Sequence, residues 1–176
     1  KPLAEEILSF YQPEHTKPPN IAAILHHYIY NHIDYQNRDH DTEPLQNVQQ
    51  TWENGGNCEE QSILLASLLE SYKHFDTAFL AVSSHQGNHL VLRTKIKNHD
   101  PQKAGDTIRR TYKRNPEIHY TPEHIYWENY SGQNWFIADP VQSRWLGDLE
   151  RLHSNGHINK TGRHNWEWNH ILDNEI

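Results

Sequence analysis

The spacing of apolar residues changes partway along the chain, from a helical period to a strict alternation. In the first half, apolar side chains recur every three or four residues, which predicts α-helices. The predicted helices span residues 2–11, 20–34 with Asn20 as the N-cap, a short segment between Pro44 and Gly55, and 58–72. The last of these is apolar around most of its circumference, so we expect it to lie in the middle of the domain.

After Phe75 the apolar residues alternate with polar ones, and this pattern predicts strands. The predicted strands cover residues 77–83, 88–97, 118–127 and 135–139. The polar stretch 98–116 contains a predicted short helix at 106–114, and residues 145–152 are predicted to be helical. Helices followed by antiparallel strands are typical of an α+β fold, and 176 residues fit a single domain, 1–176.

Charge and composition narrow the classes of partner. The formal net charge of −7 gives the chain no general attraction for nucleic acid or for an anionic membrane surface. No apolar run approaches the ~18 residues that a membrane-spanning helix needs. The chain starts with Lys1-Pro2 and contains no Met, so we expect a processed chain or an excised domain. That expectation favours an extracytoplasmic or membrane-anchored setting.

The only cysteine, Cys58, follows two glycines at the predicted start of the apolar helix. A thiol reacts as its thiolate, and the positive end of a helix macrodipole stabilises that anion. The flanking Glu59 and Glu60 oppose the anion by their charge. Position alone therefore leaves two interpretations of Cys58, a nucleophile or a buried and inert side chain.

Cysteine catalysis requires a histidine that takes the thiol proton and a third group that orients the imidazole. His89 opens one predicted strand, and Asp139 ends another. If these strands pair, the two side chains meet near the N-terminus of the cysteine helix. His85 is the alternative base, but it lies in the predicted turn between two strands.

Three segments resemble the motifs of a known family: TWENGGNCEEQSILLASLLES around Cys58, GNHLVL around His89 and NWFIADP around Asp139. Their residues and their order are similar to the Cys, His and Asp motifs of the transglutaminase-like superfamily, whose members share a papain-like core. The resemblance covers about residues 42–141 and leaves a helical N-terminal part, 1–41, and a C-terminal extension, 142–176. Trp52 stands where the family usually has Leu, one glycine of the usual turn is missing, and 98–116 resembles an insertion.

The resemblance implies a papain-like/transglutaminase-like core, in which a central helix bearing Cys58 packs on an antiparallel β-sheet. It also implies a cysteine-dependent enzyme that acts on amide bonds of a protein or peptide substrate through a thioester, without a metal or other cofactor. In that enzyme Cys58 attacks, His89 shuttles the proton and Asp139 orients His89. Hydrolysis of the thioester would make the enzyme a peptidase or amidase, and transfer to a lysine would make it a transglutaminase.

The same resemblance leaves two questions open. The backbone N–H of Cys58 is the expected first donor to the oxyanion, and the indole N–H of Trp52 is a candidate second donor. The alternative for Trp52 is a core aromatic packed under the turn. The alternative for the whole chain is a catalytically inactive binding module that keeps the fold.

Two sets of residues fall outside this scheme. The first set consists of histidines and raises the hypothesis of a metal site. No HExxH pattern and no second cysteine supports a metal site, so we expect scattered surface histidines and no metal. The second set is basic, and we interpret it as a solvated face, with contact to an anionic partner as the alternative. The histidines are His26, His27, His153, His157, His164 and His170, and the basic residues are Lys97, Lys103, Arg109, Arg110, Lys113 and Arg114.

Overall fold

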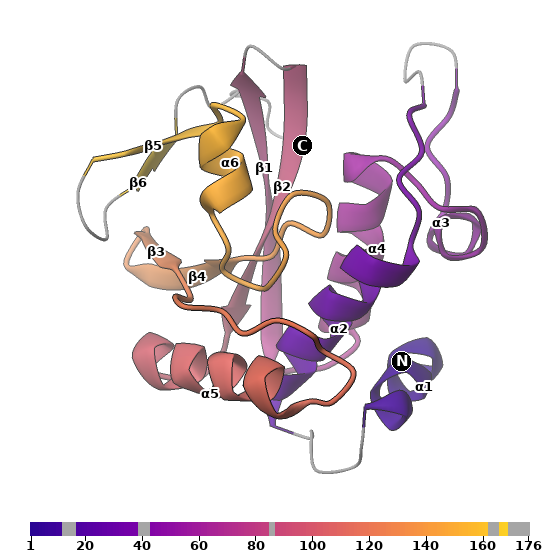
Figure 1. The fold of residues 1–176 in the computed structure, drawn as a ribbon. Helices are drawn as coiled ribbons and strands as arrows, with labels where there is room; N and C mark the ends of the chain where they lie inside the picture. The colour runs from indigo at the N-terminus through magenta and orange to yellow at the C-terminus, as the bar shows by residue number, and fades with distance from the viewer. Residues whose placement is uncertain (12–16, 39–42, 85–86, 162–165, 169–176) are drawn as a thin grey trace.

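A four-stranded antiparallel sheet with helices packed against it forms the centre of the molecule (Figure 1). The structure is a computed structural model that describes residues 1–11, 17–38, 43–84, 87–161 and 166–168. The strands lie in the order β1-β2-β4-β3. The α+β class predicted from the sequence is therefore confirmed. The four strands are β1 (Phe75–Ser84), β2 (Gly87–Ile96), β3 (Trp127–Tyr130) and β4 (Gln133–Ile137).

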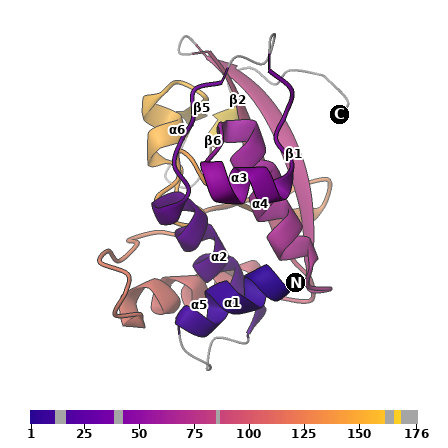
Figure 2. The same cartoon turned by 90° about the vertical axis from the view of Figure 1, so that its right-hand side faces the viewer.

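The helix that begins at Cys58 is central in this arrangement, as its apolar circumference predicted. It contacts β1 and β2 on one side and the second helix on the other, and Figure 2 shows it lying along the β1–β2 hairpin. Leu64 and Leu65 on this helix are fully buried. The first four helices are α1 (Pro2–Phe10), α2 (Pro18–His32), α3 (Val48–Asn54) and α4 (Cys58–Glu70).

The start of α2 differs from the prediction. Lys17 is the N-cap, and Pro18 opens the first turn, where a missing N–H costs no hydrogen bond and the fixed φ suits a helix. The predicted N-cap, Asn20, lies inside the helix, and its Oδ1 accepts a hydrogen bond of 2.9 Å from Thr111 Oγ1. Asn20 therefore links two helices instead of starting one.

The polar stretch after β2 forms a longer helix than predicted, α5 (Pro101–Arg114). The carboxylate of Asp100 accepts a hydrogen bond of 2.9 Å from the N–H of Lys103, and Pro101 occupies the first helical position. Ala104, Ile108 and Tyr112 are buried on the face that contacts α2. An acidic N-cap followed by proline is a helix-start signal, so this sequence already contained the correct boundary.

The predicted strand at 118–127 is wrong, because only Trp127 enters a strand. Pro116 and Pro122 have no N–H to donate to a neighbouring strand. Ile118 is buried in the main hydrophobic core, which also contains Leu25, Leu64 and Ile108. The N–H of Tyr126 donates to the carbonyl of Gly147 at 3.0 Å. The alternating apolar residues of this segment therefore cover the helical core without pairing as a strand.

The C-terminal part of the described chain packs against the sheet. The helix predicted at 145–152 begins later, as α6 (Glu150–Ser154), and is followed by the two-stranded sheet of β5 (Ile158–Lys160) and β6 (Trp166–Trp168). Residues on both sides of this contact are buried together in a second core. Its buried members are Leu80, Val82, Val91, Ile137, Leu149, Leu152 and Ile158.

Candidate active site

Cys58 is the first residue of α4, and its side chain is half-buried. The side chain of Asn57 caps the helix by accepting hydrogen bonds of 3.0 Å from the N–H groups of Glu59 and Glu60. Within the described part of the chain, the N–H of Cys58 has no hydrogen-bond partner, so it is the donor that the first turn leaves available. The helix terminus thus offers both its positive end and one free amide at the thiol.

The charge of Glu60, which by sequence alone opposes a thiolate, is compensated within the fold. Its carboxylate accepts the N–H of Asn57 at 3.0 Å and the N–H of Gln46 at 2.8 Å, and Arg38 Nη1 lies 3.1 Å from Oε1. Burial by itself raises the pKa of Glu60, but these hydrogen bonds and the arginine outweigh burial and hold the pKa below its ordinary value. Glu60 therefore closes a capping box and is paired with a cation.

The structure brings His89 and Asp139 into direct contact. His89 lies near the start of β2, and Asp139 follows the end of β4, which is tied to β2 by a hydrogen bond of 2.7 Å from Ala138 N–H to the carbonyl of Leu92. His89 Nε2 lies 2.6 Å from Asp139 Oδ2. Both side chains are buried. This distance is that of a strong, charge-assisted hydrogen bond.

The other oxygen of Asp139 is also satisfied. Oδ1 accepts hydrogen bonds from the backbone N–H groups of Val141, at 2.9 Å, and Gln142, at 3.0 Å. Burial by itself raises the pKa of Asp139, but the charge of His89 and these hydrogen bonds outweigh burial, and the pKa lies below its ordinary value. The carboxylate is therefore an anion fixed in one orientation.

Cys58 and His89 line the same cavity. Burial by itself lowers the pKa of His89, but the charge of Asp139 and the side-chain hydrogen bonds to Asp139 and Cys58 raise it to about 10. Because Nε2 is bonded to Asp139, Nδ1 is the ring nitrogen left for the thiol. At neutral pH the imidazole beside the carboxylate of Asp139 is therefore protonated.

A cavity of about 230 Å³ contains this thiol and imidazole. Two of its lining residues, Tyr35 and His157, were not singled out as catalytic candidates from the sequence. Among the residues that the structure describes, the lining is Tyr35, Cys58, Gly87, Asn88, His89, Val141, Gln142 and His157. None of these lining side chains is acidic.

His26 was expected at the surface, but it lies in the interior and contacts the backbone of Asp139. It is fully buried on α2, and its Nε2 lies 3.0 Å from the backbone carbonyl of Asp139. Burial lowers the pKa of His26 to about 4, so the ring is neutral at pH 7 and its Nε2–H donates to that carbonyl. A neutral histidine on α2 thereby fixes the backbone of the residue that orients His89.

His157 contacts the ring of His89 directly. The two ring centroids lie 5.3 Å apart with planes inclined by 32°. The side chain of Gln142 bridges this region, since its Nε2 lies 3.4 Å from His157 Nε2 and its Oε1 accepts a hydrogen bond of 3.0 Å from Asn155. The segment between α6 and β5 therefore forms one wall of the cavity.

The position of Trp52 does not support the hypothesis that its indole N–H is the second donor to the oxyanion. Its indole stacks on the ring of Tyr28, with centroids 5.3 Å apart and planes inclined by 9°, and it packs against the main core. Trp52 does not line the cavity that contains Cys58. The structure thus favours the alternative of a packed aromatic.

The expectation of scattered surface histidines is wrong for His26, His27 and His157, which are buried, whereas His153 is exposed. Each buried ring has a polar or aromatic neighbour in the fold, as shown by the 2.8 Å distance between His27 Nδ1 and the hydroxyl of Tyr120. Among the described residues, no three His, Cys, Asp or Glu side chains are grouped to hold a metal ion. His85, His164 and His170 lie outside the described residues.

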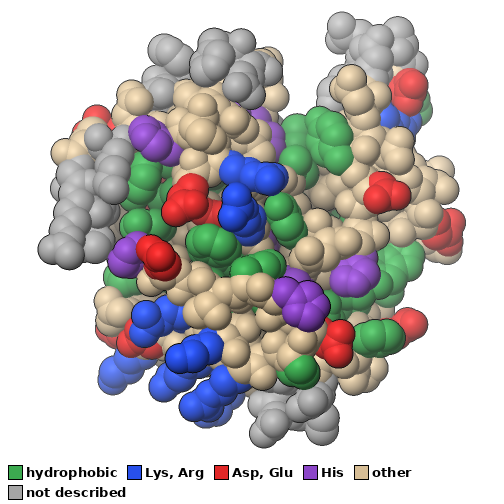
Figure 3. All heavy atoms as spheres, viewed as in Figure 1, with side chains coloured by type: hydrophobic (Ala, Val, Ile, Leu, Met, Phe, Trp, Pro, Cys, Tyr) green, Lys and Arg blue, Asp and Glu red, His purple; other side chains and the backbone are tan. Residues whose placement is uncertain are grey.

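The basic residues form an exposed face of α5. Figure 3 shows Lys and Arg side chains gathered at the lower left of the molecule, over that helix. Lys97 lies apart from them and makes an ion pair of 2.5 Å with Asp76. The exposed members on α5 are Lys103, Arg109, Arg110, Lys113 and Arg114. Opposite them lies the buried face of the same helix, which is the arrangement of a solvated amphipathic helix.

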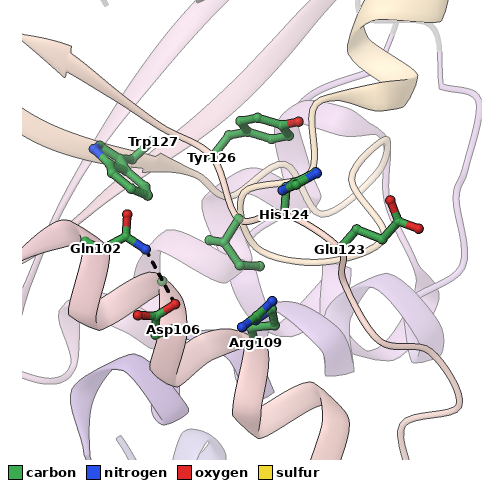
Figure 4. A pocket seen from close by; sticks show the side chains of 9 residues that line it. Gln102, Asp106, Arg109, Glu123, His124, Tyr126 and Trp127 are labelled. Atoms are coloured by element: carbon green, nitrogen blue, oxygen red, sulfur yellow. Dashed lines mark hydrogen bonds between the residues drawn. The ribbon is translucent and has the colours of Figure 1, made fainter. Parts of the chain in front are cut away.

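A larger cavity, of about 630 Å³, lies between α5 and the segment before β3 (Figure 4). It shares no lining residue with the cavity that contains Cys58. In Figure 4, Gln102 and Asp106 project from α5 toward it and are joined by a hydrogen bond of 3.4 Å. Gly105, which lies between them on the helix, also lines this cavity.

We expect Gly105→Ala to stabilise the protein. A Cβ at this position would meet Ile125 and Trp127 at 3.6 Å, which is ordinary contact, and alanine favours the interior of a helix over glycine by about 1 kcal/mol. The free energy of unfolding should rise by about 0.5–1 kcal/mol and the melting temperature by about 2–4 °C, measured by urea and thermal denaturation. Gly147→Ala is the matched control and should destabilise, because Gly147 has φ +82° and its Cβ would lie 2.8 Å from the carbonyl oxygen of Tyr126. A loss of stability in Gly105→Ala would contradict this account of α5.

Comparisons with known protein families, curated proteins and solved structures found no match to this chain. The function must therefore be argued from the site itself. None of the described helices is both long and apolar enough to span a membrane.

Proposed function

We propose that this protein is a cysteine-dependent enzyme that acts on amide bonds of a protein or peptide through a thioester, with Cys58, His89 and Asp139 as its catalytic residues. The observation that carries the proposal is the buried pair of Asp139 and His89 at the cavity that also contains Cys58, the first residue of α4. A helix bearing the cysteine against an antiparallel sheet bearing the histidine is also the arrangement of a papain-like core, which we propose for this fold.

The reaction follows from the protonation states. The sulfur of Cys58, as thiolate, attacks the carbonyl carbon of the amide and forms a C–S bond, and the carbonyl oxygen becomes the oxyanion of a tetrahedral intermediate. The N–H of Cys58 donates to that oxyanion. As the C–N bond breaks, His89 gives its Nδ1 proton to the leaving amine, and a thioester remains on Cys58. Asp139 keeps the ring in the orientation that presents Nδ1 to the reacting atoms.

The second half of the reaction restores the enzyme. His89, now neutral, takes a proton from water or from an amine, which attacks the thioester carbon. The C–S bond breaks, the sulfur leaves as thiolate, and the released product is an acid or a new amide. Water and an amine attack the thioester in the same way, so hydrolysis and acyl transfer are two outcomes of one site.

Acylation with p-nitrophenyl acetate tests the proposal without a known substrate. We expect wild-type protein to release p-nitrophenolate and to gain one acetyl group at Cys58, detected by mass spectrometry of the quenched protein and removed by hydroxylamine, as a thioester requires. Adding a primary amine to the acetylated protein then measures how the acyl group divides between water and amine. Cys58→Ser is the control and should carry no hydroxylamine-sensitive acetyl group.

The competing function is a binding module that keeps the fold without catalysis. No acylation of Cys58 under conditions where the protein is folded would favour that module and would contradict the proposed enzyme. Modification at lysines alone, unchanged in Cys58→Ser, would have the same meaning.

A further inference from the structure

We propose that the phenolic hydroxyl of Tyr35 is the second hydrogen-bond donor to the oxyanion formed at Cys58. This inference rests on the proposed function and identifies a further catalytic residue for it. The N–H of Cys58 supplies one donor, and an effective oxyanion hole has two or more donors from backbone or side chains. Trp52, the candidate from the sequence, is stacked on Tyr28 and does not line the cavity.

The backbone of Tyr35 is tied to the turn that leads into Cys58. Tyr35 forms a parallel β-bridge with Gly56, in which Gly56 N–H donates to the carbonyl of Asp34 and Gln36 N–H donates to the carbonyl of Gly56, both at 3.0 Å. Gly56 lies two residues before Cys58. The position of Tyr35 is therefore defined relative to the start of α4.

The two glycines before Cys58 make this approach feasible. A Cβ on Gly55 would lie 2.4 Å from the carbonyl oxygen of Asp34, and Gly55 has φ +81°. A Cβ on Gly56 would lie 2.8 Å from the Cβ of Glu60. Gly55 thus allows the chain segment of Tyr35 to lie close to the cysteine turn, and Gly56 allows that turn to pack closely against α4.

A buried side chain of α4 holds the same segment in place. Gln61 Nε2 donates to the carbonyls of Ile33 at 3.3 Å, Asp34 at 3.2 Å and Gly56 at 2.9 Å. Gln61 is 1 % exposed, so these hydrogen bonds are shielded from water. The helix that carries Cys58 thereby holds both the segment just before Tyr35 and the bridge partner of Tyr35, Gly56.

The hydroxyl of Tyr35 is available to donate a hydrogen bond in the cavity. It lines the cavity with Cys58 and His89, and within the described chain its hydroxyl has no hydrogen-bond partner. Burial and then the charge of the Cys58 side chain raise the pKa of Tyr35 above its ordinary value, so the phenol keeps its proton at neutral pH. The hydroxyl can therefore donate to a nearby anion.

The other polar side chains of the cavity are less suited to this role. The amide of Gln142 is engaged by Asn155 on its oxygen and faces His157 with its nitrogen. Asn88 lies on β2 opposite Ser83, and among the residues that the structure describes no β-bridge joins it to the cysteine turn. Tyr35 is the lining donor that is both uncommitted and anchored beside Cys58.

The test compares two reactions of the same thiol. Acylation by p-nitrophenyl acetate passes through an oxyanion, whereas alkylation by iodoacetamide is a direct displacement that forms none. We expect Tyr35→Phe to slow acylation of Cys58 by about 10- to 100-fold and to leave alkylation within about twofold of wild type, since a lost oxyanion donor costs on the order of 10²–10³ in a water-excluded site and less in a half-open one. Tyr130→Phe is the matched control, because Tyr130 and Tyr35 are each 55 % exposed, and it should change neither rate.

Each outcome separates this inference from the proposed function. If Tyr35→Phe acylates as fast as wild type, Tyr35 is not the donor, while the enzyme itself stands. If both reactions slow equally, Tyr35 acts on the thiol and the oxyanion role is overturned. Selective slowing in Asn88→Ala, without an effect in Tyr35→Phe, would assign the second donor to Asn88. Wild-type protein that neither acylates nor alkylates faster than a free thiol would overturn the proposed function, and the inference with it.

Discussion

Replacing His89 by alanine is expected to slow the alkylation of Cys58 by iodoacetamide at pH 6 by about 10- to 100-fold. Only about 0.3 % of a thiol with the ordinary pKa of about 8.5 is thiolate at pH 6, and a neighbouring cation favours the thiolate form. A stabilised thiolate is intrinsically less nucleophilic, with a Brønsted coefficient of about 0.4–0.5, which removes part of that gain. The remaining factor is the expected difference between the two proteins.

The pH profile distinguishes the ion pair from simple exposure of the thiol. Because a protonated His89 favours the thiolate, the wild-type rate should rise less steeply between pH 6 and 8 than the rate of His89→Ala. In His89→Ala the rate should rise about tenfold per pH unit over that range, as for a free thiol. His119→Ala, which replaces an exposed histidine, is the control and should follow the wild-type profile. A wild-type rate that climbs with pH as steeply as that of His89→Ala would show that Cys58 is an ordinary thiol.

Asp139→Asn is expected to reduce acylation of Cys58 by about 10³-fold while keeping the shape of the side chain. The oxygen of the new amide would accept from Val141 and Gln142, and its NH₂ group would then face His89 Nε2. That arrangement turns Nε2 into an acceptor and moves the ring proton to Nδ1, where the neutral ring cannot take a proton from the thiol. The wrong tautomer is the reason for the large loss.

The same variant should change how stability depends on pH. The pKa of Asp139 is lowered in the folded state, so its contribution is present above about pH 4 and is lost as pH falls through the folded-state value. The pKa of His89 is raised to about 10, so its contribution is complete below about pH 6.5 and is lost as pH rises toward 10. Urea denaturation should show the largest difference between wild type and Asp139→Asn near pH 5, about 3 kcal/mol, and a clearly smaller difference at pH 9. A difference that is the same at both pH values would contradict the charged pair.

Local signals in the sequence predicted the helices and the position of Cys58 well. The two glycines before Cys58 and the apolar period of α4 are short-range features, and the structure places the helix start at the residue that they indicated. The contact between His89 and Asp139 depends on residues 50 positions apart. Composition alone does not predict such a contact, and it was the similarity of three motifs and their order that pointed to this pair.

The rest of the site depends on packing that no local pattern contains. Tyr35 reaches the cavity only because the chain after α2 pairs with Gly56, and His157 only because the C-terminal segment folds back over the sheet. Trp52 has a suggestive spacing to Cys58, but the orientation of α3 places its ring on Tyr28. The spacing along the chain thus suggested Trp52 as the second donor to the oxyanion, whereas the tertiary structure favours Tyr35, the residue that we propose.

The hydrogen bond from His26 to the carbonyl of Asp139 has a consequence for when the thiol becomes reactive. It joins residues 113 positions apart, so the carboxylate that orients His89 is set in place only after the N-terminal helices and the segment beyond β4 have come together. During synthesis Cys58 emerges from the ribosome long before Asp139 does. If Cys58 is the nucleophile that we propose, the nascent chain carries its thiol before the pair of His89 and Asp139 exists, and the ability to form acyl adducts arises only with the completed fold.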